Sequence, residues 1–131
     1  MKTATREYNG KNVDLDKLAQ LIVEFFNEEH FKTQSGRHPD GILIQAKKGG
    51  VFRTLLAMDR AFTIVIEGDQ SNFKIKMGVG SWLKDLGVAA IEIFFVSELV
   101  AFVEVPEALW SYEIEHQLWH YIENQIELGI Q

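Results

Sequence analysis

The stretch AFTIVIEGDQSNFKIKMGVGSW, residues 61–82, has the strongest pattern in the chain. Apolar side chains alternate with other residues on both sides of a loop at residues 68–72, which contains Gly, Asp and Asn. Because strand side chains point to opposite faces with a period of two, this pattern indicates a β-hairpin with one apolar face and one mostly polar face. The predicted core face carries Phe62, Ile64, Ile66, Phe73 and Ile75, and Thr63 falls on the opposite face.

Before the hairpin, the sequence predicts a helix that can cover this apolar face. Asp14 is a good N-cap because its carboxylate can accept hydrogen bonds from the free backbone N–H groups of the first turn. Apolar residues then recur at helical spacing up to about His30. This amphipathic segment is therefore expected to pack on the hairpin.

The remaining N-terminal segments predict short elements around this helix. We expect an edge strand over residues 3–8, a loop over 33–41, a strand over 42–47 and a short helix or turn over 51–58. The loop is expected because Gly36 and Pro39 interrupt it.

Two helices are expected after the hairpin. Residues 86–105 are mostly apolar and have no central Gly or Pro, which favours a helix over a strand pair. Three glutamates in this segment argue against a membrane span, since carboxylates are costly inside a bilayer. Pro106 ends it, and the final helix, 107–128, carries an i,i+4 apolar row of Trp110, Ile114, Leu118, Ile122 and Ile126. The whole chain, 1–131, is thus predicted to be one α+β domain. Its small, mainly antiparallel sheet is covered by the N-terminal helix, and the two C-terminal helices add a second apolar layer.

Charge and cysteine content narrow the function classes. The 131 residues contain no Cys and carry a formal net charge of -6. The absence of Cys, and of an apolar segment near the N-terminus, favours a reducing, cytoplasmic location. Residues 85–131 hold nine acidic residues and no Lys or Arg, whereas residues 32–84 hold nine basic and four acidic residues. We expect no nucleic-acid binding, because an acidic chain neutralises phosphates poorly.

One face of the second hairpin strand carries the candidate ligand-binding residues. Gly78 and Gly80 lack side chains, so a helix or a flat ligand could approach the sheet closely there. Packing of the fold itself is the more common reason for such glycines. A flat apolar ligand such as haem would also need nearby cations and an axial His. The residues proposed for such a pocket are Gly78, Gly80, Trp82, Arg53, Lys74 and Lys76, with His30, His38 or the pair His116 and His120 as axial ligand.

His116 and His120 stand one helical turn apart, so both imidazoles leave the same face of the final helix. This spacing can chelate a divalent metal and occurs in the zinc motif HExxH. Here the residues between them are Gln117, Leu118 and Trp119, so the general-base glutamate of that motif is missing. A solvated polar face is the competing interpretation.

Several short motifs resemble a bacterial domain of unassigned function that often accompanies zinc-ribbon or short C-terminal interaction modules. They are the run of residues 44–50, the Arg53–Leu56 segment, Met58, Arg60-Ala61 and the pattern Gly78-x-Gly80-x-Trp82. The resemblance covers roughly residues 15–82. It implies an interaction module and brings no established ligand or reaction.

These patterns favour a non-catalytic binding or interaction module that associates with itself. The expected partner is a second copy, in a homodimer through the C-terminal helices, because the helices carry more apolar surface than one small sheet covers. A pocket for a flat apolar ligand such as haem is the alternative, and a divalent-metal site or an enzyme is the next. No catalytic residues can be assembled from the sequence.

Overall fold

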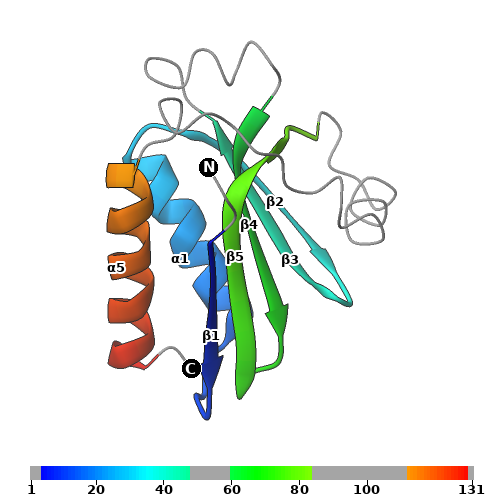
Figure 1. Cartoon of the computed structure of the whole chain (residues 1–131), viewed down its shortest axis with the longest axis vertical. Helices are drawn as coiled ribbons and strands as arrows, with labels where there is room; N and C mark the ends of the chain where they lie inside the picture. The colour runs from blue at the N-terminus through cyan, green and yellow to red at the C-terminus, as the bar shows by residue number, and fades with distance from the viewer. Residues whose placement is uncertain (1–3, 48–59, 84–111, 130–131) are drawn as a thin grey trace.

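The computed structural model describes residues 4–47, 60–83 and 112–129. Its elements in chain order are β1 (Ala4–Asn9), α1 (Leu15–Glu28), β2 (Lys32–His38), β3 (Gly41–Lys47), β4 (Arg60–Gly68), β5 (Asn72–Ser81) and α5 (Tyr112–Leu128). The strands form one five-stranded sheet in the order β1-β5-β4-β3-β2, and every neighbouring pair is antiparallel. The α+β class and the antiparallel sheet are therefore confirmed (Figure 1).

The predicted hairpin lies at the centre of the sheet. β4 pairs with β5 in a register that places Ile64 opposite Met77 and Ile66 opposite Ile75. The loop is tighter than expected, because the strands extend to Gly68 and Asn72 and leave three residues between them. The side chains expected on the core face are all buried in one apolar cluster with both helices. This register was therefore predicted correctly.

α1 covers the β2 and β3 side of the sheet. The Asp14 carboxylate accepts a hydrogen bond from the backbone N–H of Lys17 at 3.1 Å, as expected for an N-cap. Leu18, Ile22 and Phe26, spaced at helical intervals, are fully buried in the core. The Phe26 ring lies 5.8 Å from that of Phe62 on β4, which fixes the helix over the hairpin.

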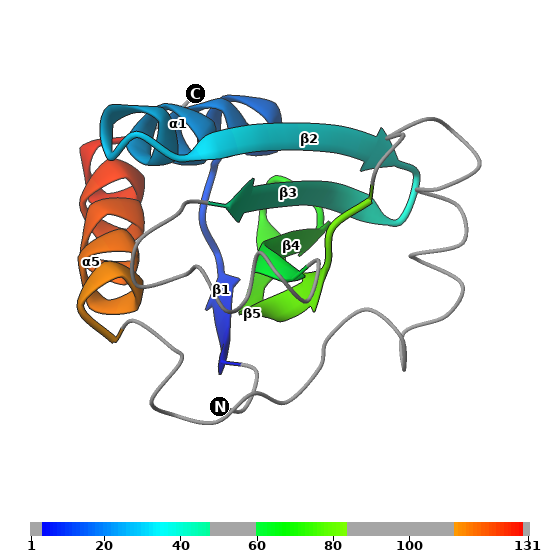
Figure 2. The same ribbon diagram turned by 90° about the horizontal axis from the view of Figure 1, so that it is seen from above.

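α5 packs beside α1 on the same face of the sheet, next to β1 (Figures 1 and 2). Leu118, Ile122 and Ile126 from its predicted apolar row are buried in the common core. The Tyr121 ring lies 5.4 Å from the Phe25 ring of α1, which joins the two helices. The expectation that the C-terminal helices add a second layer is wrong for α5, because this helix shares the layer of α1. The described residues contain one C-terminal helix, and the other one expected, 86–105, lies outside them.

A polar hydrogen-bonded corner attaches α5 to the first strand. Arg6 and Tyr8 of β1 both contact the Glu123 carboxylate, Arg6 through an ion pair and Tyr8 through a 3.4 Å hydrogen bond from its hydroxyl. The Tyr8 ring also stacks on Phe73, with centroids 5.2 Å apart. Burial, followed by the nearby Glu123 carboxylate, raises the pKa of Tyr8 to about 12.

Two other expectations are wrong. Residues 33–41 do not form a loop, because residues up to His38 belong to β2, which pairs with β3 along its whole length. The polar sequence of β2 fits an edge strand, whose pairing needs backbone groups and little apolar surface. The face of the hairpin opposite the helices is also not simply polar. Ala61, Thr63 and Val65 are buried there, and only the end near the hairpin loop is charged.

The short element expected at 51–58 lies outside the described residues, as does Arg53. Within the described ranges, neither helix has the length and apolar character needed to cross a bilayer.

Candidate functional site

The strongest candidate site is a groove between α1 and the outer strand β2. It has a volume of about 390 Å³ and is lined by Asp16, Ala19, Gln20, Val23, Ser35, Gly36, Arg37 and Ile42. Ala19 and Val23 of α1, with Ile42 of β3, make its apolar part. The groove lies where α1 packs against β2 and β3. We call it the α1–β2 groove.

An exposed ion pair spans the rim of the α1–β2 groove. Nη1 of Arg37 lies 2.5 Å from the Asp16 carboxylate, which joins the end of β2 to the start of α1. Both side chains are more than half exposed, 68% for Arg37 and 57% for Asp16. Exposed pairs contribute about 0–1 kcal/mol, so either group can exchange its partner at little cost.

On the opposite face of the sheet, Gln45 forms a buried hydrogen-bond network. Its amide donates to the Thr63 hydroxyl at 3.2 Å and to the Ser81 carbonyl at 2.7 Å. Its carbonyl oxygen accepts from the Gln34 amide at 2.8 Å and from the Leu83 backbone N–H at 3.0 Å. All the hydrogen-bonding positions of this fully buried amide are thus used. The network holds the end of β5 against β3.

Trp82 lies next to this network and is covered by lysines. Nζ of Lys47 is 4.0 Å from the centre of the Trp82 ring, and Nζ of Lys32 is 5.9 Å away. The tryptophan itself is buried. Its contacts with the two lysines have cation–π geometry, and the buried ring packs within the fold.

The structure separates the residues predicted for a ligand pocket. Gly78 is opposite Thr63 and Gly80 is opposite Ala61, and both glycines are buried. Lys74 and Lys76 lie nearer the hairpin loop, where each pairs with Glu67, at 3.5 and 3.2 Å. Their charges are therefore balanced within the sheet. A haem-type pocket at these residues stays a prediction.

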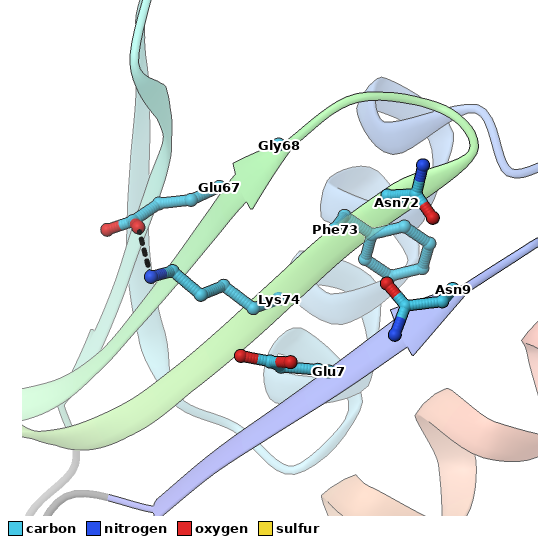
Figure 3. Close-up of a pocket in the computed structure, with 7 residues that line it drawn as sticks. All are labelled: Glu7, Asn9, Glu67, Gly68, Asn72, Phe73 and Lys74. Atoms are coloured by element: carbon cyan, nitrogen blue, oxygen red, sulfur yellow. Dashed lines mark ion pairs between the residues drawn. The ribbon is translucent and has the colours of Figure 1, made fainter.

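The described residues also line two polar hollows. The first, of about 390 Å³, lies near the hairpin loop and is lined by Glu7, Asn9, Glu67, Gly68, Asn72, Phe73 and Lys74. Figure 3 shows Lys74 turned towards Glu67, with Glu7 on the neighbouring strand. The second, of about 530 Å³, lies between the start of α1 and the hairpin loop. Each is lined by charged groups of both signs.

The histidines proposed as metal or haem ligands are distributed over the molecule. His116 and His120 are both exposed on α5, on the side away from its buried row. His30 follows α1 with a φ of 65°, and it is exposed. His38 lies at the end of β2, where its Nδ1 accepts from the Asp40 backbone N–H at 3.0 Å. Among the described residues, no group of three or more His, Cys, Asp or Glu side chains has the arrangement of a metal site.

Comparisons of the chain with protein-family models, with curated proteins and with solved structures found no match. The resemblance to a bacterial domain of unassigned function stays a prediction.

The sequence interpretation missed the residues of the α1–β2 groove. Ser35 and Arg37 lie in the segment expected to be a loop. Residues 33–37 are polar or Gly throughout and show no apolar alternation, so the signal available was the turn residues Pro39 and Asp40 before a clear strand. The short turn before Gly41 would have completed a hairpin.

Proposed function

We propose that the chain is a non-catalytic interaction module that binds an extended segment of a partner along the outer edge of β2. The observation that supports it is the α1–β2 groove beside this edge. β2 ends the sheet, and no described strand lies beyond it. An edge strand offers unpaired backbone N–H and C=O groups, and a peptide can add to it as a further strand.

The other outer strand offers a less suitable edge. β1 carries α5 against its helix-facing side, where Arg6 and Tyr8 are engaged by Glu123. On β2 the corresponding positions are Thr33, Ser35 and Arg37, and the α1–β2 groove lies beside them. An added strand directs every second side chain to one face. A strand added to β2 would therefore direct these side chains into the α1–β2 groove.

Selection from a display library of random peptides tests this function. The bait is the wild-type protein, and peptides that also bind the Ser35→Phe variant are removed. Ser35 is exposed and lines the groove, so a phenylalanine there fills the groove from the strand side. Gln20→Trp fills it from the helix side and serves as a second blocking variant. Thr5→Phe on β1 is the matched control, because it adds the same bulk at an exposed position of the other edge strand.

We expect enriched peptides that bind wild type and Thr5→Phe but bind neither blocking variant. Thermal unfolding of all variants must show that they fold like wild type. Enrichment that is the same with the blocked variants would overturn binding at this edge, as would no enrichment at all.

Self-association is a separate proposal. In the described part of the chain, Leu128 is the exposed large apolar side chain, at 78%, and the apolar row of α5 packs in the protein's own core. A homodimer through the C-terminal helices would therefore depend on residues outside the described ranges. Sedimentation at tens of micromolar tests it, because weak dimers dissociate at lower concentrations. A dimer is expected, and a monomer would contradict it.

A further inference from the structure

We infer that the partner segment is acidic, with an apolar side chain that enters the α1–β2 groove between flanking Asp or Glu residues. This inference depends on the proposed function and names the chemistry of its partner. It follows from the charges along the edge, the shape of the groove and the exposed position of Arg37.

The charged residues of β2 and of its neighbour β3 are all basic. β2 and β3 contain Lys32, Arg37 and Lys47, and neither strand contains Asp or Glu. Lys32 and Arg37 are exposed, near the two ends of β2. Arg37 lies on the groove side of the sheet, where it pairs with Asp16. Lys32 lies on the other side, over the Trp82 ring, so a segment paired along β2 would have one cation on each side. Acidic side chains at the matching positions would be attracted, and basic ones repelled.

The same charges disfavour a second copy of β2 as the occupant. An antiparallel pair centred on Ser35 would place Lys32 opposite His38, and Arg37 opposite Thr33. Such a pair places no carboxylate of β2 opposite Lys32 or Arg37, so a different and acidic segment fits better.

The groove accepts an apolar side chain beside Arg37. The residues of β2 that face the helices are short at Thr33 and Ser35, and Ile42 on β3 lies behind them. Together with Ala19 and Val23 of α1, they leave a space of about 390 Å³. A strand added to β2 would send one of its alternate side chains into this space.

Arg37 can reach an incoming carboxylate without loss of a strong contact. Its partner Asp16 lies at the groove rim, and their ion pair is exposed to solvent. Exchange of one exposed carboxylate for another changes little in the free protein. Asp16 therefore competes with the acidic partner for Arg37, which gives the inference a specific test.

Three synthetic peptides of equal length test the partner's chemistry, in which a central valine is flanked on each side by glutamates, by lysines or by threonines, so that the flanking residues fall on both faces of the added strand. Fluorescence anisotropy measures their binding to wild type. We expect the glutamate peptide to bind most tightly and to weaken as salt is added, because the charges at this edge are exposed. Arg37→Glu should weaken it about five- to tenfold and improve binding of the lysine peptide. Asp16→Asn, which releases Arg37, should strengthen binding of the glutamate peptide.

The outcomes separate this inference from the proposed function. If all three peptides bind equally, and Ser35→Phe still abolishes binding, the edge is the docking site and the acidic partner is wrong. Preference for the lysine peptide overturns the acidic partner in the same way. If no peptide binds and the library gives no enrichment, both proposals fail. Weaker binding of the glutamate peptide to Asp16→Asn would also contradict the role of Arg37.

Discussion

The guanidinium carbon of Arg6 lies 4.5 Å from the centre of the Trp119 ring, while the same guanidinium pairs with Glu123. Arg6 belongs to β1, and both partners lie one turn apart on α5. One side chain thus holds the last helix against the first strand through a cation–π contact and an ion pair. The carboxylate and the arginine are about half exposed, so the contact is accessible to salt.

Replacement of Arg6 by Ala should lower the free energy of unfolding by about 1 kcal/mol. Exposed cation–π contacts contribute about 0.5–1 kcal/mol, and an exposed ion pair adds little. Chemical denaturation in low and high salt measures the loss, which should be smaller in high salt. Lys11→Ala, which removes an exposed charge outside this corner, is the matched control. Equal losses for the two variants would show that Arg6 does not hold α5.

Gln45→Leu should destabilise the protein strongly, by about 2–4 kcal/mol. The leucine is similar in size, but it removes all four hydrogen bonds of the amide and leaves buried partners unpaired, each costing about 1–3 kcal/mol. Among those partners are the Thr63 hydroxyl and the Ser81 carbonyl. Gln117→Leu, at an exposed position of α5, controls for the change of residue type. Denaturation curves that coincide for the two variants would refute a structural role of the network.

The raised pKa of Tyr8 predicts a loss of stability in alkaline solution. Its hydroxyl stays protonated in the folded protein up to about pH 12, whereas in the unfolded chain it ionises near pH 10.0. The folded state therefore holds the proton more tightly. The stabilisation of the folded state that results from this difference in pKa is fully present below pH 10.0, and it is lost as the pH rises to about 12.

Tyr8→Phe should make the free energy of unfolding less dependent on pH in that range. The ring can still stack on Phe73, so stability near neutral pH should change little. Denaturant unfolding at a series of alkaline pH values measures the slope of the free energy of unfolding against pH. Tyr121→Phe should reduce it too, because burial and the carboxylates of Glu24 and Glu28 raise the pKa of Tyr121. If the free energy of unfolding of Tyr8→Phe depends on pH as that of wild type does, the pKa of this hydroxyl is not raised in the folded protein.

Titration with haem and, separately, with zinc or nickel tests the alternative functions. We expect no Soret shift, because Gly78 and Gly80 are buried and the cations Lys74 and Lys76 already pair with Glu67. We also expect at most weak metal uptake, from the exposed His116 and His120, and none after both are changed to Ala. A Soret shift that His30→Ala or His38→Ala abolishes would replace the interaction module with a ligand pocket.

The sequence predicted the parts of the fold that have strict apolar periodicity. β3, β4, β5 and α1 each bury a regular set of large apolar side chains, so their patterns are clear. β2 was missed because an edge strand is held by backbone pairing with β3 and needs few apolar residues. Burial of Thr63 was also missed, because the alternation of apolar and polar residues in the hairpin indicated a solvated face. In the structure the Thr63 hydroxyl accepts a hydrogen bond from the side-chain amide of Gln45 on the neighbouring strand, so it can be buried.

The candidate site was less predictable than the fold. The α1–β2 groove depends on where α1 crosses the sheet, a relation between elements that periodicity does not contain. The residues chosen from sequence share one strand face, as expected from their alternation at 74, 76, 78, 80 and 82. The distribution of charge and burial along that face separates them, because Lys74 and Lys76 lie at the charged end and Trp82 at the buried end.

The corner formed by β1 and α5 also has a kinetic consequence. Arg6 and Glu123 are 117 residues apart in sequence, so their contact closes a very long loop. From β2 to β5, strands that follow one another along the chain pair with each other and form a meander, which makes local assembly of that part faster. We expect β1 and α5 to join the meander late in folding and to open first from the native state. Amide hydrogens of β1 should therefore exchange with solvent before those of β4, even though both strands belong to one sheet.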